Sequence, residues 1–173
     1  MNEATPQRSV NLVAAIYDFQ HARSQAKLEA IKARLTGKSM HLFSYEEVRQ
    51  KLRATGSASR GLQEISLDAI IGSVGRYDDF TRSFLPLRDG DAGRWARVKA
   101  ATLDLTGLPP IEVYQIGEAY FVLDGNHRVS VARQLDARTI QAYVTEVRTK
   151  VPISPDTQPD ELILKAENAD FLE

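Results

Sequence analysis

Polar residues that could do chemistry follow one another where an apolar run ends, at residues 124–128, which read Asp-Gly-Asn-His-Arg. The run before them, residues 120–123, is aromatic and apolar, as in a buried strand. After them, Val131 and Leu135 recur at the four-residue spacing of a helix. The sequence therefore predicts a strand that turns into a helix starting near residue 126 or 127.

Such a turn suits a phosphate group. The first amides of a helix have no partner within the helix, and the helix dipole adds partial positive charge there. Gly125 would let a ligand approach the backbone, while Asn126, His127 and Arg128 would add an amide, an imidazole and a permanent cation. These four residues could hold a phosphate, and His127 could instead transfer a proton.

Asp124 fits several roles in this turn. It could cap the new helix, hold a metal ion or accept a proton. The whole turn also has a structural interpretation, because Asp-Gly is a common turn and an Arg in the first turn of a helix often pairs with a nearby carboxylate. Residue types and spacing alone leave both interpretations open.

A second stretch with chemical potential covers residues 72–80. Two glycines precede Arg76 and could expose backbone amides as an anion nest, and Arg76 and Arg82 could add charge around the same phosphate. Asp78 and Asp79 could bind Mg²⁺ or act as a general base. Alternatively, one of these two acids only caps a following helix.

Residues 110–147, with their Asp-Gly-Asn-His-Arg core, resemble the ParB/sulfiredoxin superfamily, whose members place a Gly-x-x-Arg turn against the phosphates of a bound nucleotide. Gly125 and Arg128 match the fixed ends of that turn, and Asn126 and His127 fill its variable middle. The free serine kinases of the superfamily carry Asp-Gly-His-His-Arg. This chain differs from that pattern only at Asn126.

The chain also departs from other members of the superfamily. Sulfiredoxin carries its reactive Cys at the position of Asn126, and this chain has no Cys, so sulfiredoxin chemistry is excluded. The partition proteins carry Gly-Glu-Arg-Arg, which differs at Asn126 and His127. The serine kinases carry a catalytic Glu after their first strand, where this chain has no Glu between residues 64 and 112, so Asp78 or Asp79 would take that role.

The resemblance implies a ParB-like domain that binds a nucleoside triphosphate or diphosphate with Mg²⁺. If the domain is an enzyme, phosphoryl transfer or nucleotide hydrolysis is the expected reaction, since charge neutralisation by Arg and metal supplies most of that chemistry. The expected catalytic residues are Asp78, Asp79 and His127. The expected metal ligands are Asp78 and Asp124. The expected phosphate contacts are Arg76, Asp124, Gly125, Asn126, His127 and Arg128.

Composition and charge bound the class of protein. The chain has 173 residues, 43% of them hydrophobic, and no apolar run approaches the roughly 20 residues that span a bilayer, so we expect a cytoplasmic globular protein without membrane contact. Residues 1–60 hold 10 Lys and Arg against 5 Asp and Glu, whereas residues 151–173 hold one Lys and six acids. The chain is therefore basic at its start and acidic at its end.

The basic start is predicted to be helical from residue 9 to 35, with a second short helix after the capping box at residues 44–47. The two would form a helical hairpin. Four cations share one helix face within an arc of about 60°, beside an apolar stripe of Leu28, Ile31 and Leu35. That face is either solvated or binds DNA or a protein, and a homodimer is a further expectation. The four cations are Arg23, Lys27, Arg34 and Lys38.

The remaining pattern predicts an α+β fold, a ParB/sulfiredoxin-like small mixed or antiparallel sheet with helices, preceded by the helical hairpin. Residues 55–61 are expected to be a flexible linker, which divides the chain into a basic segment 1–60, a ParB/sulfiredoxin-like domain 61–150 and an acidic tail or linker 151–173. Residues 111–116 and 119–123 should form a hairpin, residues 140–147 a further strand, and Trp95 a core anchor on a helix. The alternative function is a non-enzymatic regulator that binds DNA or a protein.

Overall fold

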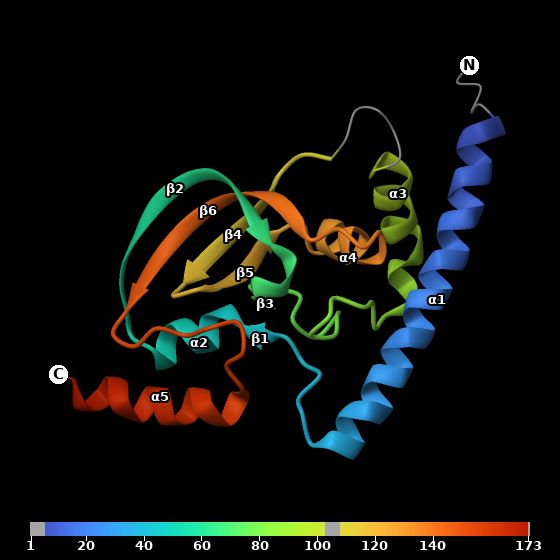
Figure 1. The fold of residues 1–173 in the computed structure, drawn as a ribbon. Helices are drawn as coiled ribbons and strands as arrows, with labels where there is room; N and C mark the ends of the chain where they lie inside the picture. Colours follow the sequence, from blue (N-terminus) through green and yellow to red (C-terminus); the bar gives the residue numbers. More distant parts are fainter. Residues whose placement is uncertain (1–5, 103–107, 173) are drawn as a thin grey trace.

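A mixed six-stranded sheet forms the centre of the computed structural model, which describes residues 6–102 and 108–172 (Figure 1). The strand order is β1-β3-β5-β4-β6-β2. Pairing is parallel for β1 with β3, β3 with β5 and β4 with β6, and antiparallel for β4 with β5 and β2 with β6. The strands are β1 Phe43–Ser44, β2 Ala54–Ser66, β3 Ile70–Ser73, β4 Ile111–Ile116, β5 Ala119–Asp124 and β6 Thr139–Thr149.

Five α-helices surround this sheet, so the predicted α+β class is confirmed. They are α1 Pro6–Thr36, α2 Tyr45–Lys51, α3 Ala92–Thr102, α4 Asn126–Gln134 and α5 Pro159–Phe171. The predicted β4–β5 hairpin, the last strand β6 and the helix that starts directly after β5 are all present. Within the described residues, no helix is long and apolar enough to cross a bilayer.

Alternation along β5 divides the apolar core between the two faces of the sheet. Val122 packs with Val129 of α4 in one buried cluster. The neighbouring Phe121 points to the opposite face and packs with Val48 of α2 and Leu162 of α5. Because successive side chains of a strand point to opposite faces, this short apolar strand is covered by helices on both sides.

A third cluster joins the helices that carry the site. Trp95 of α3 is fully buried, lies 5.8 Å from the ring of Phe19 of α1, and packs with Val131 of α4. Its indole N–H donates to Ser130 Oγ at 2.9 Å. Trp95 is therefore the predicted core anchor, and it sets the position of α4 relative to α3.

The two N-terminal helices are present but do not form the predicted hairpin. Helix α1 packs along α3, whereas α2 packs against α5 and β1 on the other side of the molecule (Figure 1). On α1 the buried face is built of small residues and one aromatic, Ala15, Phe19, Ala22 and Ala26.

The predicted flexible linker at residues 55–61 is wrong, since these residues lie within β2, which pairs with β6 along its length. Small polar residues have low strand propensity, but a long partner strand supplies their backbone hydrogen bonds. The division of the chain at residues 60 and 150 stays a prediction, and its first boundary falls inside β2.

The acidic C-terminal segment is held next to β1 by a partly buried cation, Arg82. Arg82 donates to the carbonyl oxygen of Pro155 at 2.9 Å, and its guanidinium lies 4.9 Å from the ring of Phe43. Burial lowers the pKa of Arg82 to about 10. Arg82 is thus occupied here and does not join the candidate phosphate site.

We predict that Arg82→Met loosens this attachment. Loss of a hydrogen bond from a charged donor should raise amide hydrogen exchange in residues 153–158 by roughly tenfold, with little change in β4 and β5. Hydrogen-exchange mass spectrometry measures both. Arg60→Met is the matched control, because Arg60 forms an exposed ion pair with Glu146. Equal protection of residues 153–158 in the parent and in Arg82→Met would contradict the proposed attachment.

Candidate functional site

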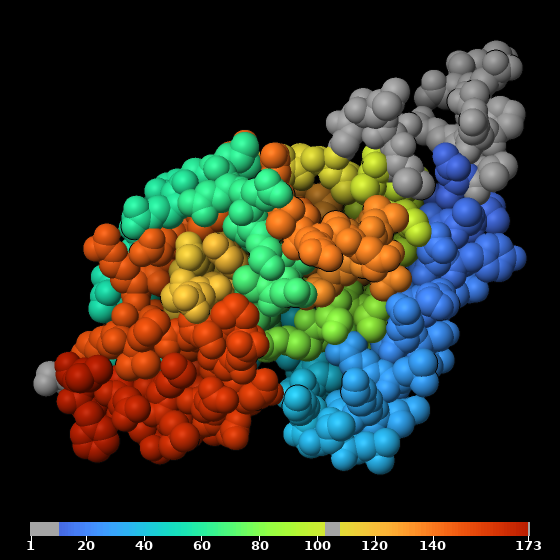
Figure 2. Space-filling view, in the orientation of Figure 1, coloured from blue at the N-terminus to red at the C-terminus, as the bar shows by residue number. Residues whose placement is uncertain are grey.

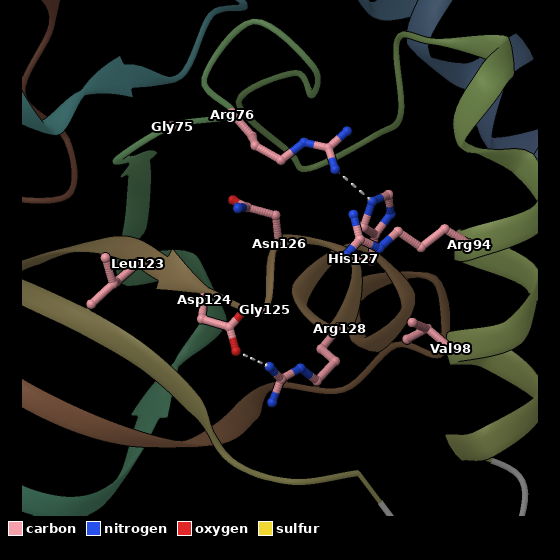
Figure 3. Close-up of a pocket in the computed structure, with 10 residues that line it drawn as sticks. All are labelled: Gly75, Arg76, Arg94, Val98, Leu123, Asp124, Gly125, Asn126, His127 and Arg128. Atoms are coloured by element: carbon pink, nitrogen blue, oxygen red, sulfur yellow. Dashed lines mark hydrogen bonds and ion pairs between the residues drawn. The ribbon is translucent and has the colours of Figure 1, made fainter.

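The two chemically loaded stretches meet at a pocket of about 310 Å³ (Figure 3). One wall follows β3, a second is the β5–α4 turn, and a third is α3. The lining residues are Gly75, Arg76, Arg94, Val98, Leu123, Asp124, Gly125, Asn126, His127 and Arg128. The structure therefore brings together the six expected phosphate contacts, Arg76 and residues 124–128, whereas Arg82 lies elsewhere.

Gly125 makes the turn between β5 and α4. Its φ of +113° lies in a region that L side chains rarely adopt, and a Cβ there would stand 2.4 Å from Ile111 Cγ2. Gly125 is the N-cap of α4, and no side chain caps the helix, so Asp124 does not take the capping role. The first amides of α4 are left for another acceptor.

Arg128 is held by the protein itself. Its guanidinium donates to Asp124 Oδ2 at 2.6 Å and to the carbonyl oxygens of Pro109 and Pro110 at 2.7 and 2.8 Å. Its side chain is 14% exposed. Arg128 therefore has the structural role that the sequence also allowed. It pairs with a nearby carboxylate and connects the start of α4 to the segment that leads into β4.

Arg76 organises the opposite wall. Its guanidinium donates to Asp79 at 2.5 Å and to both carboxylate oxygens of Asp91 at 3.0 Å. Asp79 is buried and is also paired with Arg88 at 2.7 Å. The carboxylate of Asp79 is thus shared by two guanidinium groups.

His127 completes this network through one nitrogen. Its Nε2 lies 3.2 Å from Arg76 Nη1, and because a guanidinium only donates, Nε2 accepts and the ring proton sits on Nδ1. That Nδ1 is buried and has no partner among the described residues. Burial, opposed by nearby Asp91, lowers the pKa of His127 to about 4, so the ring is neutral at pH 7.

Two side chains of the pocket have no partner among the described residues. Asn126 is 8% exposed, and its Oδ1 is buried without a hydrogen bond. Arg94 is exposed on α3 and forms no ion pair or hydrogen bond in the described part of the chain. Sequence reasoning missed Arg94. The available signal was helical spacing, since Arg94 and Val98 lie four residues apart beside the buried Trp95.

The glycine-rich stretch contributes less than expected. Gly72 is buried within β3, where a Cβ would stand 2.4 Å from the ring of Phe121, so its role is close packing. Gly75 is exposed and lines the pocket. Asp78 and Asp79 lie in a turn, not at a helix start.

The predicted acids are not gathered around one point. Asp124 lines the pocket with its side chain 67% exposed, whereas Asp78 is exposed elsewhere and does not line it. No cluster of three or more metal-ligating side chains occurs within residues 6–102 and 108–172. A Mg²⁺ ion bound with phosphates needs only one or two carboxylates, and Asp124 alone among the predicted acids lines the pocket.

Comparison with known proteins gives little further information. No protein-family model and no curated protein matches the sequence. The crystal structure of sulfiredoxin from Arabidopsis thaliana matches with a TM-score of 0.39 and 17% sequence identity, over 50% of this chain and 86% of that chain. A likeness at this level concerns the fold alone, so the resemblance of the turn at residues 125–128 to the superfamily stays a sequence prediction.

We predict that His127 makes stability depend on pH. In the unfolded chain His127 takes up a proton near the ordinary His pKa of 6.5. In the folded protein it is protonated only when the pH falls to its lowered pKa of about 4. The free energy of unfolding should therefore fall as pH drops from 6.5 toward 4, by up to roughly 3 kcal/mol. Urea denaturation measures the free energy of unfolding at each pH. Its slope against pH should be shallower in His127→Gln than in the parent, and unchanged in the exposed control His21→Gln. Identical slopes for all three proteins would refute the buried neutral imidazole.

We predict that Arg128 stabilises the fold around the turn. Arg128→Ala leaves two carbonyl oxygens without their donor and should lower the free energy of unfolding by about 1–3 kcal/mol. Chemical denaturation measures the loss. Arg138→Ala is the matched control, because Arg138 is exposed after the same helix, and it should change stability by less than about 0.5 kcal/mol. Equal stabilities of the two variants would count against this role.

Proposed function

We propose that this pocket binds a phosphate group of a nucleoside triphosphate or diphosphate. One observation carries the proposal. Helix α4 starts at an uncapped glycine that faces a pocket lined by Arg94, a cation unpaired among the described residues, and by Asn126, whose buried Oδ1 has no hydrogen bond. Uncapped helix amides, a guanidinium and the Nδ2 of an Asn side chain all donate hydrogen bonds to phosphate oxygens.

The division of labour among the three arginines follows from their partners. Arg76 and Arg128 already donate to carboxylates and carbonyls, so their hydrogen bonds hold the pocket walls in place. Arg94 has no such partner among the described residues and reaches the pocket from a third element. In this proposal Arg94 supplies the main positive charge for the ligand. The backbone amides of residues 126–128 donate hydrogen bonds that orient the phosphate.

The neighbouring groups define what a bound nucleotide would meet. Mg²⁺, when bound with the phosphates, supplies further charge neutralisation, and Asp124 is the pocket acid that would hold it. Leu123 and Val98 line the pocket on opposite sides, and each offers an apolar contact to the remainder of the nucleotide (Figure 3). Nucleotide binding is the function that these contacts support. The acceptor nitrogen of His127 and the carboxylate of Asp79 are both hydrogen-bonded to Arg76, so neither is free to abstract a proton.

A thermal-shift panel tests the proposal. ATP, ADP, CTP and GTP with Mg²⁺, and inorganic phosphate alone, are each added to the parent protein. A ligand present at 100 times its dissociation constant should add about 2.7 kcal/mol of stability. No shift with any nucleotide or with phosphate would refute the proposal.

We predict that Arg94→Gln abolishes most of this shift. Arg94 is exposed and unpaired in the described structure, so the variant should keep the stability of the ligand-free parent while its affinity falls by about tenfold or more. Isothermal titration calorimetry measures the affinity. Arg97→Gln is the matched control on the same helix, because Arg97 is exposed and does not line the pocket. An unchanged nucleotide affinity in Arg94→Gln would show that Arg94 does not bind the ligand.

A further inference from the structure

Helix α1 exposes an apolar stripe that nothing in the described chain covers. Leu28, Ile31 and Leu35 are 66%, 55% and 82% exposed. At 100° per residue they lie about 180° from the buried face of Ala22 and Ala26. An apolar stripe on the outside of a helix that already has a separate buried face marks an interaction surface.

Cations flank this stripe. The predicted basic face is only partly free, since Arg23 donates to Asp89 at 2.8 Å and its side chain is 18% exposed. Lys27 and Arg34 are exposed on α1, whereas Lys38, predicted to lie on the same helix face, is exposed just after the helix ends at Thr36. The C-terminal half of α1 therefore presents an apolar and basic surface.

Helix α5 presents the opposite combination. Its buried side contains Leu162 and Ala169, and its outer side exposes three large apolar residues beside acids. The exposed apolar residues are Ile163, Leu164 and Phe171, with exposed fractions of 54%, 61% and 88%. The exposed acids of α5 are Asp160, Glu161, Glu167 and Asp170, and Asp170 is paired with Arg53.

We propose that α1 of one copy of this chain packs on α5 of a second copy. Both helices form outer faces of the molecule (Figure 2). A groove of about 910 Å³, lined by Arg34, Lys38, Asp156 and Asp160, lies between the end of α1 and the start of α5, so the two apolar faces do not cover each other within one chain.

Charge selects this pairing over a symmetric contact of α1 with α1. The α1 stripe facing its own copy would bring Lys27, Arg34 and Lys38 close to the same cations, which is unfavourable. Facing α5, the same cations meet Glu161 and Glu167 across an apolar seam. If each α1 reaches the other copy's α5, the two reciprocal contacts form a closed, two-fold symmetric dimer. If only one such contact forms at a time, the pairing is head-to-tail and extends into longer chains.

Sedimentation velocity of the full chain tests the proposal across protein concentration and salt. We expect a mass above that of the monomer that rises with concentration and falls as salt rises from about 50 mM to about 500 mM, because the flanking ion pairs are screened. A monomer at every concentration overturns the proposal. Association that strengthens with salt would instead indicate the α1–α1 contact, in which screening relieves repulsion.

A charge swap shows whether weaker association comes from loss of the α1–α5 contact or from misfolding. Arg34→Glu with Lys38→Glu should weaken the dissociation constant by about tenfold or more, and adding Glu161→Lys with Glu167→Lys should restore it. Leu62→Glu is the matched control, because Leu62 is 51% exposed on β2, and it should leave the mass unchanged. Failure of the fourfold variant to recover, or loss of association in Leu62→Glu, overturns the proposal. So does a purely monomeric chain whose basic face instead binds duplex DNA with steep salt dependence.

Discussion

The arrangement of the pocket depends on the guanidinium of Arg76. It joins three segments that lie far apart in the sequence: the turn after β3 through Asp79, the start of α3 through Asp91, and the start of α4 through His127. A partly buried cation is costly unless it is fully paired, and here two carboxylates and one imidazole nitrogen pair it. The pairing fixes the tautomer of His127, and burial keeps the ring neutral at pH 7. The wall of the pocket is therefore held together by contacts within the protein.

The sheet and the helices place this network for ordinary packing reasons. Strand β5 is covered on both faces, so its end at Asp124 is held in position, and Gly125 allows the abrupt turn into α4 next to Ile111. The indole of Trp95 fixes α4 against α3 through Ser130. That contact brings Arg94, the residue before Trp95, to the mouth of the turn. A core contact thus decides which surface cation faces the site.

The local sequence pattern was sufficient to predict many of these elements. The hairpin of β4 and β5, the helix that starts at Asn126 and the core role of Trp95 all follow from periodicity and turn residues, and the structure contains them. The linker predicted at residues 55–61 fails because a strand can be made of small polar residues when a long partner strand supplies its hydrogen bonds. The expected hairpin of α1 and α2 also fails, since α1 packs along α3 while α2 packs against α5 and β1.

By itself the sequence determined the elements and the cluster of polar residues at 124–128, because turns, caps and helical spacing depend on neighbours within a few residues. Only the tertiary structure decided which partner each charged side chain has. Arg128 is occupied by the carbonyls of Pro109 and Pro110, Asp79 is shared between two arginines, and Arg94 is left unpaired in the described chain. The strength of a charge at a site depends on partners that arrive from distant segments, and residue type and local spacing carry no record of those partners.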